Sequence, residues 1–236
     1  MMLGRKLITR RLGGPLKAAI KNVRNEIKAA RLSRSSAKSL QHLADKELKI
    51  HLGCGTDLKP DWVNLDLQLN GSTPLSANSH AHFFNYDIRH GVPFSAGTCA
   101  IIYSSHFFEH LTYQEGVELM RDCYRALRPG GVFRICLPDF KRCFAAYLNK
   151  DRAFFDLIDL SNVLPEVERE TETLVDYINY TVYQSGEHKC VYDDEKLIRL
   201  LLHIGFSKVE HSTFQAGIDV DSETRRHFSF YVEAVK

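Results

Sequence analysis

Short apolar segments alternate with helix-like segments along most of the chain, and this alternation constrains the fold more than any other feature. Segments with the length and composition of strands occupy 48–52, 62–67, 82–86, 100–104 and 132–137, and two more follow at 207–213 and 228–235. Apolar residues spaced three or four apart predict helices over 114–127 and 193–204. Strands that alternate with helices in this way predict an α/β fold with a doubly wound, mostly parallel sheet of seven strands.

The beginning of the chain has a different character. Residues 1–38 contain eleven Lys or Arg and a single acid, Glu26, which gives this segment a formal charge of +10. The whole chain carries +2, so the remaining 198 residues carry −8. Apolar and basic residues occupy opposite faces of 15–33, and Pro15 suits the first position of a helix. We therefore predict a basic amphipathic N-terminal helix, followed by a linker over 33–38.

Several partners fit this helix. It packs on the body of the protein or on a second subunit, which would make a homodimer, or it makes a peripheral membrane contact through residues 15–33. An acid-poor start with Arg and Ser also resembles a transit peptide. In each case the concentration of positive charge points to an anionic partner for the arm and not for the whole protein.

The cysteines and the apolar segments bear on the compartment. The six cysteines show neither a CxxC pair nor any metal-ligand spacing, and most lie inside apolar segments, where a free thiol behaves as a small hydrophobe. No segment approaches the roughly 18 consecutive apolar residues of a membrane span. The start also lacks the apolar core of a secretion signal. We therefore expect a cytoplasmic protein, with peripheral membrane association as the alternative.

Glycines and carboxylates follow three successive strands. Gly53 and Gly55 flank Cys54 directly after the first strand, Asp66 ends the second, and Asp87 follows the third. Ligands of open parallel sheets bind beyond the carboxyl ends of the strands. Glycines let a ligand approach the backbone, and a carboxylate accepts hydrogen bonds from ribose hydroxyls or from an exocyclic amine. Each feature alone also fits a plain turn or a solvated acid, but together they predict a nucleoside site.

The chain resembles class I S-adenosylmethionine (SAM)-dependent methyltransferases, in particular the type 11 methyltransferase-domain family. The matching stretches are 48–56, 62–66, 86–89, 102–111 and 125–139, with 201–206 and 231–236 near the end. The resemblance implies a Rossmann-like sheet with an antiparallel last strand and SAM as cofactor. It divides the chain into an N-terminal arm, 1–45, and a methyltransferase domain, 46–236, with a substrate-side insertion over 139–190.

The resemblance also implies roles for individual residues. Gly53 and Gly55 would back the methionine part of SAM, Asp66 would hold the ribose, and Asp87 with Ile88 would frame the adenine. The remaining cofactor-binding residues that it implies are Cys54, Leu67 and Ser104. The chain departs from the family at two points. Only ten residues separate Gly55 from Asp66, so the usual helix between the first two strands is shortened or missing, and Cys99 stands where the family often has Asp.

The segment after the fourth strand contains the candidate catalytic residues. A helix starting near Ser105 would place His106, Glu109 and His110 on one face, and His188 would approach from the insertion. Three interpretations are open. His106 or His188 acts as a general base, or His106, Glu109 and His110, with or without His188, bind a divalent metal, or Glu109 and His110 only pack and cap the helix.

The metal interpretation has support from resemblance. Some ubiquinone-pathway O-methyltransferases and the enzymes that methylate small-RNA ends have a similar Glu-x-x-Glu-His pattern, although here the first position is His106. Two further features have two interpretations each. Asp139 either contacts substrate or caps the next helix, and the aromatic residues of 140–190 form either a lid or a small helical core.

These observations predict a transferase that methylates a hydroxyl of a small molecule or glycan. An RNA methyltransferase is the second enzyme hypothesis, but the acidic body argues against a nucleic-acid groove, so nucleic acid is not the expected partner. A SAM-binding regulatory or scaffold protein without turnover is the third hypothesis, because the cofactor-binding residues alone would be retained in such a protein.

Overall fold

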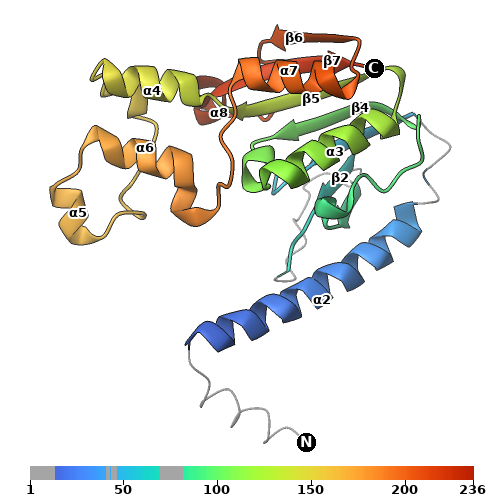
Figure 1. The fold of residues 1–236 in the computed structure, drawn as a ribbon, viewed down its shortest axis with the longest axis horizontal. Coiled ribbons are helices and arrows are strands. Elements are labelled where there is room, and N and C mark those ends of the chain that lie inside the picture. The colour runs from blue at the N-terminus through green and yellow to red at the C-terminus, as the bar shows by residue number, and fades with distance from the viewer. Residues whose placement is uncertain (1–13, 41–42, 44–46, 70–81) are drawn as a thin grey trace, which may run out of the picture.

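A computed structural model of the protein describes residues 14–40, 43, 47–69 and 82–236. Its centre is a seven-stranded sheet in the order β3-β2-β1-β4-β5-β7-β6 (Figure 1). The first five strands are parallel, and β7 is antiparallel to both β5 and β6. The strands are β1 (Leu48–Leu52), β2 (Val63–Asp66), β3 (His82–Asn85), β4 (Cys99–Ser105), β5 (Leu127–Pro138), β6 (Lys208–Ser212) and β7 (Ser229–Val235). The predicted doubly wound, Rossmann-like sheet with its antiparallel last strand is confirmed.

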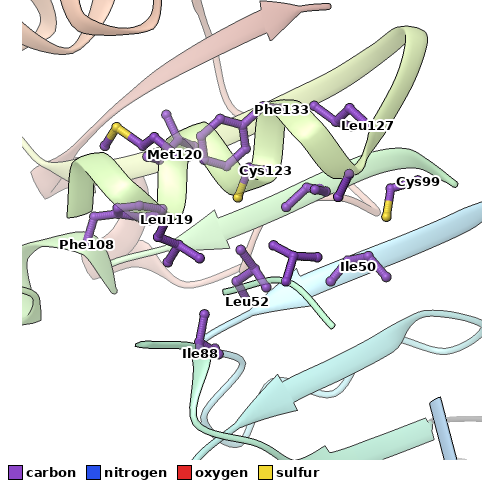
Figure 2. Close-up of a cluster of buried hydrophobic side chains, with 14 of the residues drawn as sticks. Ile50, Leu52, Ile88, Cys99, Phe108, Leu119, Met120, Cys123, Leu127 and Phe133 are labelled. Atoms are coloured by element: carbon purple, nitrogen blue, oxygen red, sulfur yellow. The ribbon is translucent and has the colours of Figure 1, made fainter. Parts of the chain in front are cut away.

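Alternate residues of β4 and β5 face opposite sides of the sheet, as the two-residue period of a strand requires. Ile102 and Phe133 point into the large core under α3 (Tyr113–Ala126) and α7 (Asp194–Ile204). Figure 2 shows part of this core, in which Leu119, Met120 and Cys123 of α3 lie over Ile50 and Leu52 of β1. Burial of these apolar side chains fixes the register of the central strands.

The other face of the sheet is covered differently. Residues 53–62, between β1 and β2, form turns without a helix, as the short spacing predicted. Trp62 and Tyr103 instead pack with residues of the β6–β7 connection, including Phe214 and Ile218. Buried Arg134 ties this connection to the sheet through its ion pair with Asp219, at 2.5 Å.

Strand β5 begins earlier than predicted. The segment 129–131, Pro-Gly-Gly, lies between the predicted helix 114–127 and the predicted strand 132–137, but β5 already begins at Leu127. The pairing of β4 with β5 shifts register here, from Cys99 opposite Leu127 to Ile101 opposite Val132. An irregularity of this kind accommodates Pro and Gly inside a strand, because the bulged residues leave the hydrogen-bonding ladder.

Helix α2 (Gly14–Leu40) is longer than predicted, and the expected linker over 33–38 is wrong because these residues are helical. Its second half lies against the edge of the sheet, where the Ser36 hydroxyl donates to the Asn85 carbonyl at 2.9 Å. The Ser33 hydroxyl accepts from the Asp87 backbone N–H at 2.9 Å. Its first half extends away from the body (Figure 1). The predicted boundary between residues 45 and 46 falls within 44–46, a segment outside the described residues.

The insertion 139–190 forms a small helical unit with its own core. Its α-helices are α4 (Phe140–Leu148), α5 (Glu166–Glu170) and α6 (Leu174–Tyr183), and its short 3₁₀ helices, labelled η, are η4 (Ala153–Phe155) and η5 (Gln184–Gly186). Phe155 and Tyr177 are buried there against Phe228 of α8 (Glu223–Phe228), so these aromatic residues build a core, as one of the two interpretations predicted. The Asp139 carboxylate accepts from the Arg142 N–H at 3.0 Å and caps α4, which confirms the capping interpretation. Within the described residues, no helix combines the length and apolarity needed to cross a lipid bilayer.

Candidate functional site

The four candidate catalytic residues line one pocket of about 200 Å³ at the carboxyl ends of β4 and β5. His106 directly follows β4, Glu109 and His110 lie on η3 (Phe108–His110), and His188 lies near the end of the insertion. Side chains of α6 and α8 line the opposite wall, including Tyr180, Thr181, Arg225 and Phe228. The fold therefore brings together residues that are about 80 positions apart in the sequence. In place of the helix predicted to start near Ser105, the chain forms only the three-residue 3₁₀ turn η3.

His106 has an unusual backbone. Its φ is +47°, a left-handed conformation that residues with a Cβ adopt rarely and that is common at functional sites. Its N–H donates to the Cys136 carbonyl at 2.9 Å, which holds the turn against β5. Its Nε2 lies 2.7 Å from the Ser229 hydroxyl, and its Nδ1 lies 3.7 Å from a Glu109 oxygen.

Glu109 is fully buried, and neither of its carboxylate oxygens has a hydrogen-bond partner among the described residues. Burial raises the pKa of this carboxyl group from 4.5 to about 8. Its backbone carbonyl accepts from the N–H groups of Lys189 and Cys190, at 2.7 and 3.2 Å, which ties the segment after His188 to η3. An unpartnered buried carboxyl group is costly, so its retention points to a function or to a bound cation.

His110 and His188 lie beside Glu109. Their rings are nearly perpendicular, with centroids 4.8 Å apart, and burial lowers the pKa of both. The His188 Nδ1 lies 2.8 Å from the Thr181 carbonyl, which only accepts, so Nδ1 carries the proton and Nε2 keeps a free lone pair. Ligand atoms of Glu109, His110 and His188 all lie within 4.8 Å of one another. The predicted metal ligands were His106, Glu109 and His110, with or without His188. The group of three that the structure brings together contains His188 and not His106.

The predicted cofactor turn lies at the same edge of the sheet. Gly53 and Gly55 have φ values of +64° and +53°, which glycine adopts without strain. The Asp66 carboxylate accepts from the N–H groups of Gly55 and Leu67, each at 2.6 Å. The Tyr86 N–H donates to the Asp66 carbonyl at 2.9 Å. The loops after the first three strands are therefore connected to one another by hydrogen bonds.

Comparison with known proteins gives a family for part of the chain. The profile of a family described as "Methyltransferase domain" matches residues 35–135. Residues 35–135 belong to this methyltransferase-domain family. The chain is also similar to a probable S-adenosylmethionine-dependent methyltransferase of Mycolicibacterium smegmatis, with 31% identity over 91 residues. That match covers 37% of this chain and 35% of the relative, so it spans about a third of the relative's length.

The fold has a solved counterpart. A SAM-dependent methyltransferase from Archaeoglobus fulgidus superposes with a TM-score of 0.51 at 16% identity, over 90% of this chain and 94% of that one. At this identity the similarity concerns the fold alone. It agrees with the family match and with the sheet order described above.

Several residues of the methyltransferase domain fit a SAM molecule. Each Asp66 oxygen accepts one backbone N–H and keeps a lone pair for a ribose hydroxyl. The buried Ser104 hydroxyl on β4 has no partner among the described residues, so it is free to contact a ligand. Cys54 is buried beside this turn, where burial raises the pKa of its thiol and keeps it neutral. The donor and acceptor groups of the glycine turn, Asp66 and Ser104 thus suit a SAM molecule, and their roles stay predictions.

The residues expected to frame the adenine are arranged differently from the sequence-based expectation. The Asp87 carboxylate is buried and accepts from Arg89 at four short distances between 2.6 and 3.2 Å. Arg89 also pairs with Glu26 of α2 at 3.1 Å. Asp87 therefore has its acceptor sites occupied by Arg89, and α2 closes the edge next to buried Ile88. Binding of an adenine amine by Asp87 stays a prediction.

Sequence reasoning did not find two residues of this region. The Phe107 ring lies directly against Gly53, where a Cβ at Gly53 would collide with it. Its position next to His106 was the only signal in the sequence. Arg225 lines the pocket from α8, and nothing in its sequence context distinguished it from neighbouring Arg226.

Proposed function

We propose that the protein transfers a methyl group from SAM to a hydroxyl oxygen of a small molecule or glycan, with a divalent cation bound by Glu109, His110 and His188. One observation supports this proposal most directly: a fully buried carboxyl group without a hydrogen-bond partner among the described residues lies within 4.8 Å of two imidazoles in one pocket. Phe107 connects this pocket with the glycine turn, since it contacts Gly53 and lies two residues before Glu109.

The donor set suits a cation. One carboxylate and two neutral imidazoles are ligands that first-row divalent ions such as Mn²⁺ and Zn²⁺ accept. The Thr181 carbonyl orients His188 by accepting from its Nδ1, as an outer partner of a metal-binding imidazole does. A bound cation would supply the counter-charge that Glu109 lacks and would acidify an acceptor hydroxyl.

The chemistry needs little more from the protein than orientation and a proton acceptor. SAM supplies an electrophilic methyl group on a sulfonium. The acceptor oxygen forms the new C–O bond as the C–S bond breaks, and the electron pair of that bond stays on sulfur. The hydroxyl proton leaves to a base, and the described pocket offers the imidazole of His106 for that step. If no cation binds, His188 Nε2 takes this role instead.

A turnover screen tests the proposal. The purified protein is incubated with SAM and with sugars, glycolipid precursors, phenols or RNA, with and without Mg²⁺, Mn²⁺ or Zn²⁺ and a chelator, and release of the demethylated product is measured. We expect transfer to a hydroxyl acceptor that the chelator abolishes and a cation restores. Transfer that is indifferent to chelation would favour the general base alone, and transfer only to RNA would change the acceptor class. SAM binding without transfer to any acceptor would favour a scaffold.

Helix α2 supports a proposal about location. Leu16, Val23 and Ile27 are 50, 59 and 49% exposed, and they lie on the side of the helix turned away from the contacts that Ser33 and Ser36 make. Basic side chains flank this apolar stripe. We propose that the stripe lies on an anionic membrane surface, because a helix carrying this much positive charge is repelled by a second copy of itself but attracted by acidic lipids.

Vesicle sedimentation tests this location. We expect binding to phosphatidylglycerol-containing vesicles, weakened by salt and lost in the double variant V23E/I27E, while the control variant L202E, exposed on α7, binds normally. Dimerisation of the wild-type protein without vesicle binding would assign the stripe to a second subunit. The free cysteines, five of them buried, support the expectation of a reducing, cytoplasmic compartment.

A further inference from the structure

Arg225 is held in a defined position at the pocket wall. Its backbone N–H donates to the Ser222 hydroxyl at 3.1 Å, which caps α8. The preceding β6–β7 connection is anchored to the sheet by the buried ion pair of Arg134 with Asp219. The side chain of Arg225 is half-buried and lines the same pocket as Glu109 and His188.

The guanidinium of Arg225 makes no hydrogen bond or ion pair with the described part of the chain, unlike buried Arg134 and the partly exposed Arg125. Arg134 is held by Asp219 and Glu233, at 2.5 and 2.7 Å, and Arg125 is held by Asp122 at 2.5 Å. Burial lowers the pKa of Arg225. The more distant groups of Tyr103, Tyr231 and Asp57 raise this pKa but offset the effect of burial only in part. A half-buried cation without a counter-charge is unfavourable unless a ligand provides one.

The surroundings leave this charge available to a ligand. Neighbouring Arg226 already pairs with Asp221 at 2.5 Å, and Asp57 pairs with Lys59 at 3.1 Å. No ion pair joins Arg225 to Glu109, the one carboxyl group among the described residues that line the pocket. Apolar groups of Ile158 and Phe228 complete this wall. A planar guanidinium beside apolar surface matches a ligand with one planar or tetrahedral anionic group on an apolar or sugar body.

We infer that Arg225 binds an anionic group of the methyl acceptor, a carboxylate or a phosphate. The inference rests on the proposed function, because it defines the class of acceptor that the pocket takes: a hydroxyl compound that also carries an acid. Arg225 holds the acid while the hydroxyl faces His188 and Glu109 across the pocket. This arrangement orients the oxygen that is methylated.

Binding of small probes, measured without turnover, tests the inference. The intact protein is saturated with the demethylated cofactor product, S-adenosylhomocysteine, and titrated with benzoate, phenyl phosphate and uncharged benzyl alcohol, with binding followed by ligand-observed NMR. We expect the two anions to bind and benzyl alcohol to bind more weakly. In R225Q both anions should bind roughly tenfold to hundredfold more weakly, the range for loss of one charge-assisted hydrogen bond. R225K keeps the positive charge but loses the planar pair of N–H donors, so its affinity for the anions should lie between those of the wild type and R225Q.

R226Q is the matched control, since Arg226 is the next residue on α8 but is exposed and paired with Asp221. It should bind the anions as the wild type does. Thermal melting confirms that each variant is folded. The inference is overturned if neither anion binds the wild type, if benzyl alcohol binds equally well, or if R225Q retains full anion affinity. It is also overturned if R225Q weakens binding of S-adenosylhomocysteine and not of the probes, because Arg225 would then hold the carboxylate of the cofactor.

The readouts separate this inference from the proposed function. Failure of the wild type to bind S-adenosylhomocysteine, with anion preference still present and lost in R225Q, would refute the methyltransferase proposal and leave the anion site in place. Methyl transfer to neutral acceptors only would refute the anion site and leave the enzyme.

Discussion

The replacement Glu109→Gln is expected to stabilise the metal-free protein at alkaline pH. The folded protein holds the Glu109 proton with a pKa of about 8, against 4.5 for an exposed carboxyl group. The contribution of Glu109 to the free energy of unfolding is therefore fully present below pH 4.5 and is lost as pH rises through about 8. The reason is that ionisation of this carboxyl group is more costly in the folded chain than in the unfolded one. At about 1.36 kcal/mol per pKa unit, the loss is about 5 kcal/mol in total. Glutamine has a similar shape and never ionises, so E109Q escapes this loss.

Thermal melts of wild type and E109Q, in a chelating buffer from about pH 5 to about pH 9, measure the effect. The melting temperature of E109Q should exceed that of wild type by roughly 10–20 °C at the alkaline end and by far less at the acid end. E118Q, which changes an exposed carboxylate on α3, serves as the control and should follow the wild type at every pH. Parallel pH profiles for wild type and E109Q would refute the reasoning, since they would mean that Glu109 is solvated or paired in the folded protein.

Two further substitutions test features of the fold. Gly53→Ala should destabilise the protein by about 1–3 kcal/mol, because alanine is strained at a φ of +64° and its Cβ would collide with the Phe107 ring; chemical denaturation measures the loss. Asp219→Asn should cost about 3–5 kcal/mol in the same assay, because it leaves the fully buried guanidinium of Arg134 without its principal counter-charge.

Each of these substitutions has a matched control. Gly55→Ala has the same left-handed backbone but open space around the new Cβ, so it should cost less than Gly53→Ala. Asp221→Asn removes an Arg–Asp pair of the same segment that is exposed, so it should cost about 1 kcal/mol or less. Equal losses within either pair would show that steric collision, in the first case, or burial, in the second, does not determine the cost.

The strands and the two main helices of the body were predictable because their period is a local property. The β1 bounds, 48–52, agree with the prediction, and α7 begins one residue later than expected. The N-terminal helix was cut short in the prediction because serines at 33–36 are typical of linkers, whereas here the Ser33 and Ser36 hydroxyls bond to the edge of the sheet. Around these serines the buried side chains of the helix are a mixture of small and apolar residues, Ala29, Ser33 and Leu40, and this short mixture is weaker than the apolar pattern by which the other helices were recognised.

The site was only partly predictable for a related reason. Its residue types were found, but His188 joins Glu109 through backbone hydrogen bonds that connect Lys189 and Cys190 to η3, and no spacing in the sequence reports such a long-range contact. The significance of Arg225 depends on its having no ion-pair partner among the described residues, which is a property of the folded neighbourhood. Neighbouring Arg226 has the same side chain, but it is exposed and forms an ion pair with Asp221.

The contact between Phe107 and Gly53 has a consequence for the order of events during turnover. If SAM binds on the glycine turn as proposed, the Phe107 ring, which lies against Gly53, would have to move aside. The adjacent Phe108 is fully buried in the core, so we expect the movement to be confined to Phe107 and the turn that carries Glu109. The pocket would then reach its final shape only after SAM has bound, so we expect an ordered mechanism in which SAM binds before the acceptor. In such a mechanism S-adenosylhomocysteine inhibits competitively against SAM but not against the acceptor. Random binding of the two substrates would show that Phe107 does not control the order.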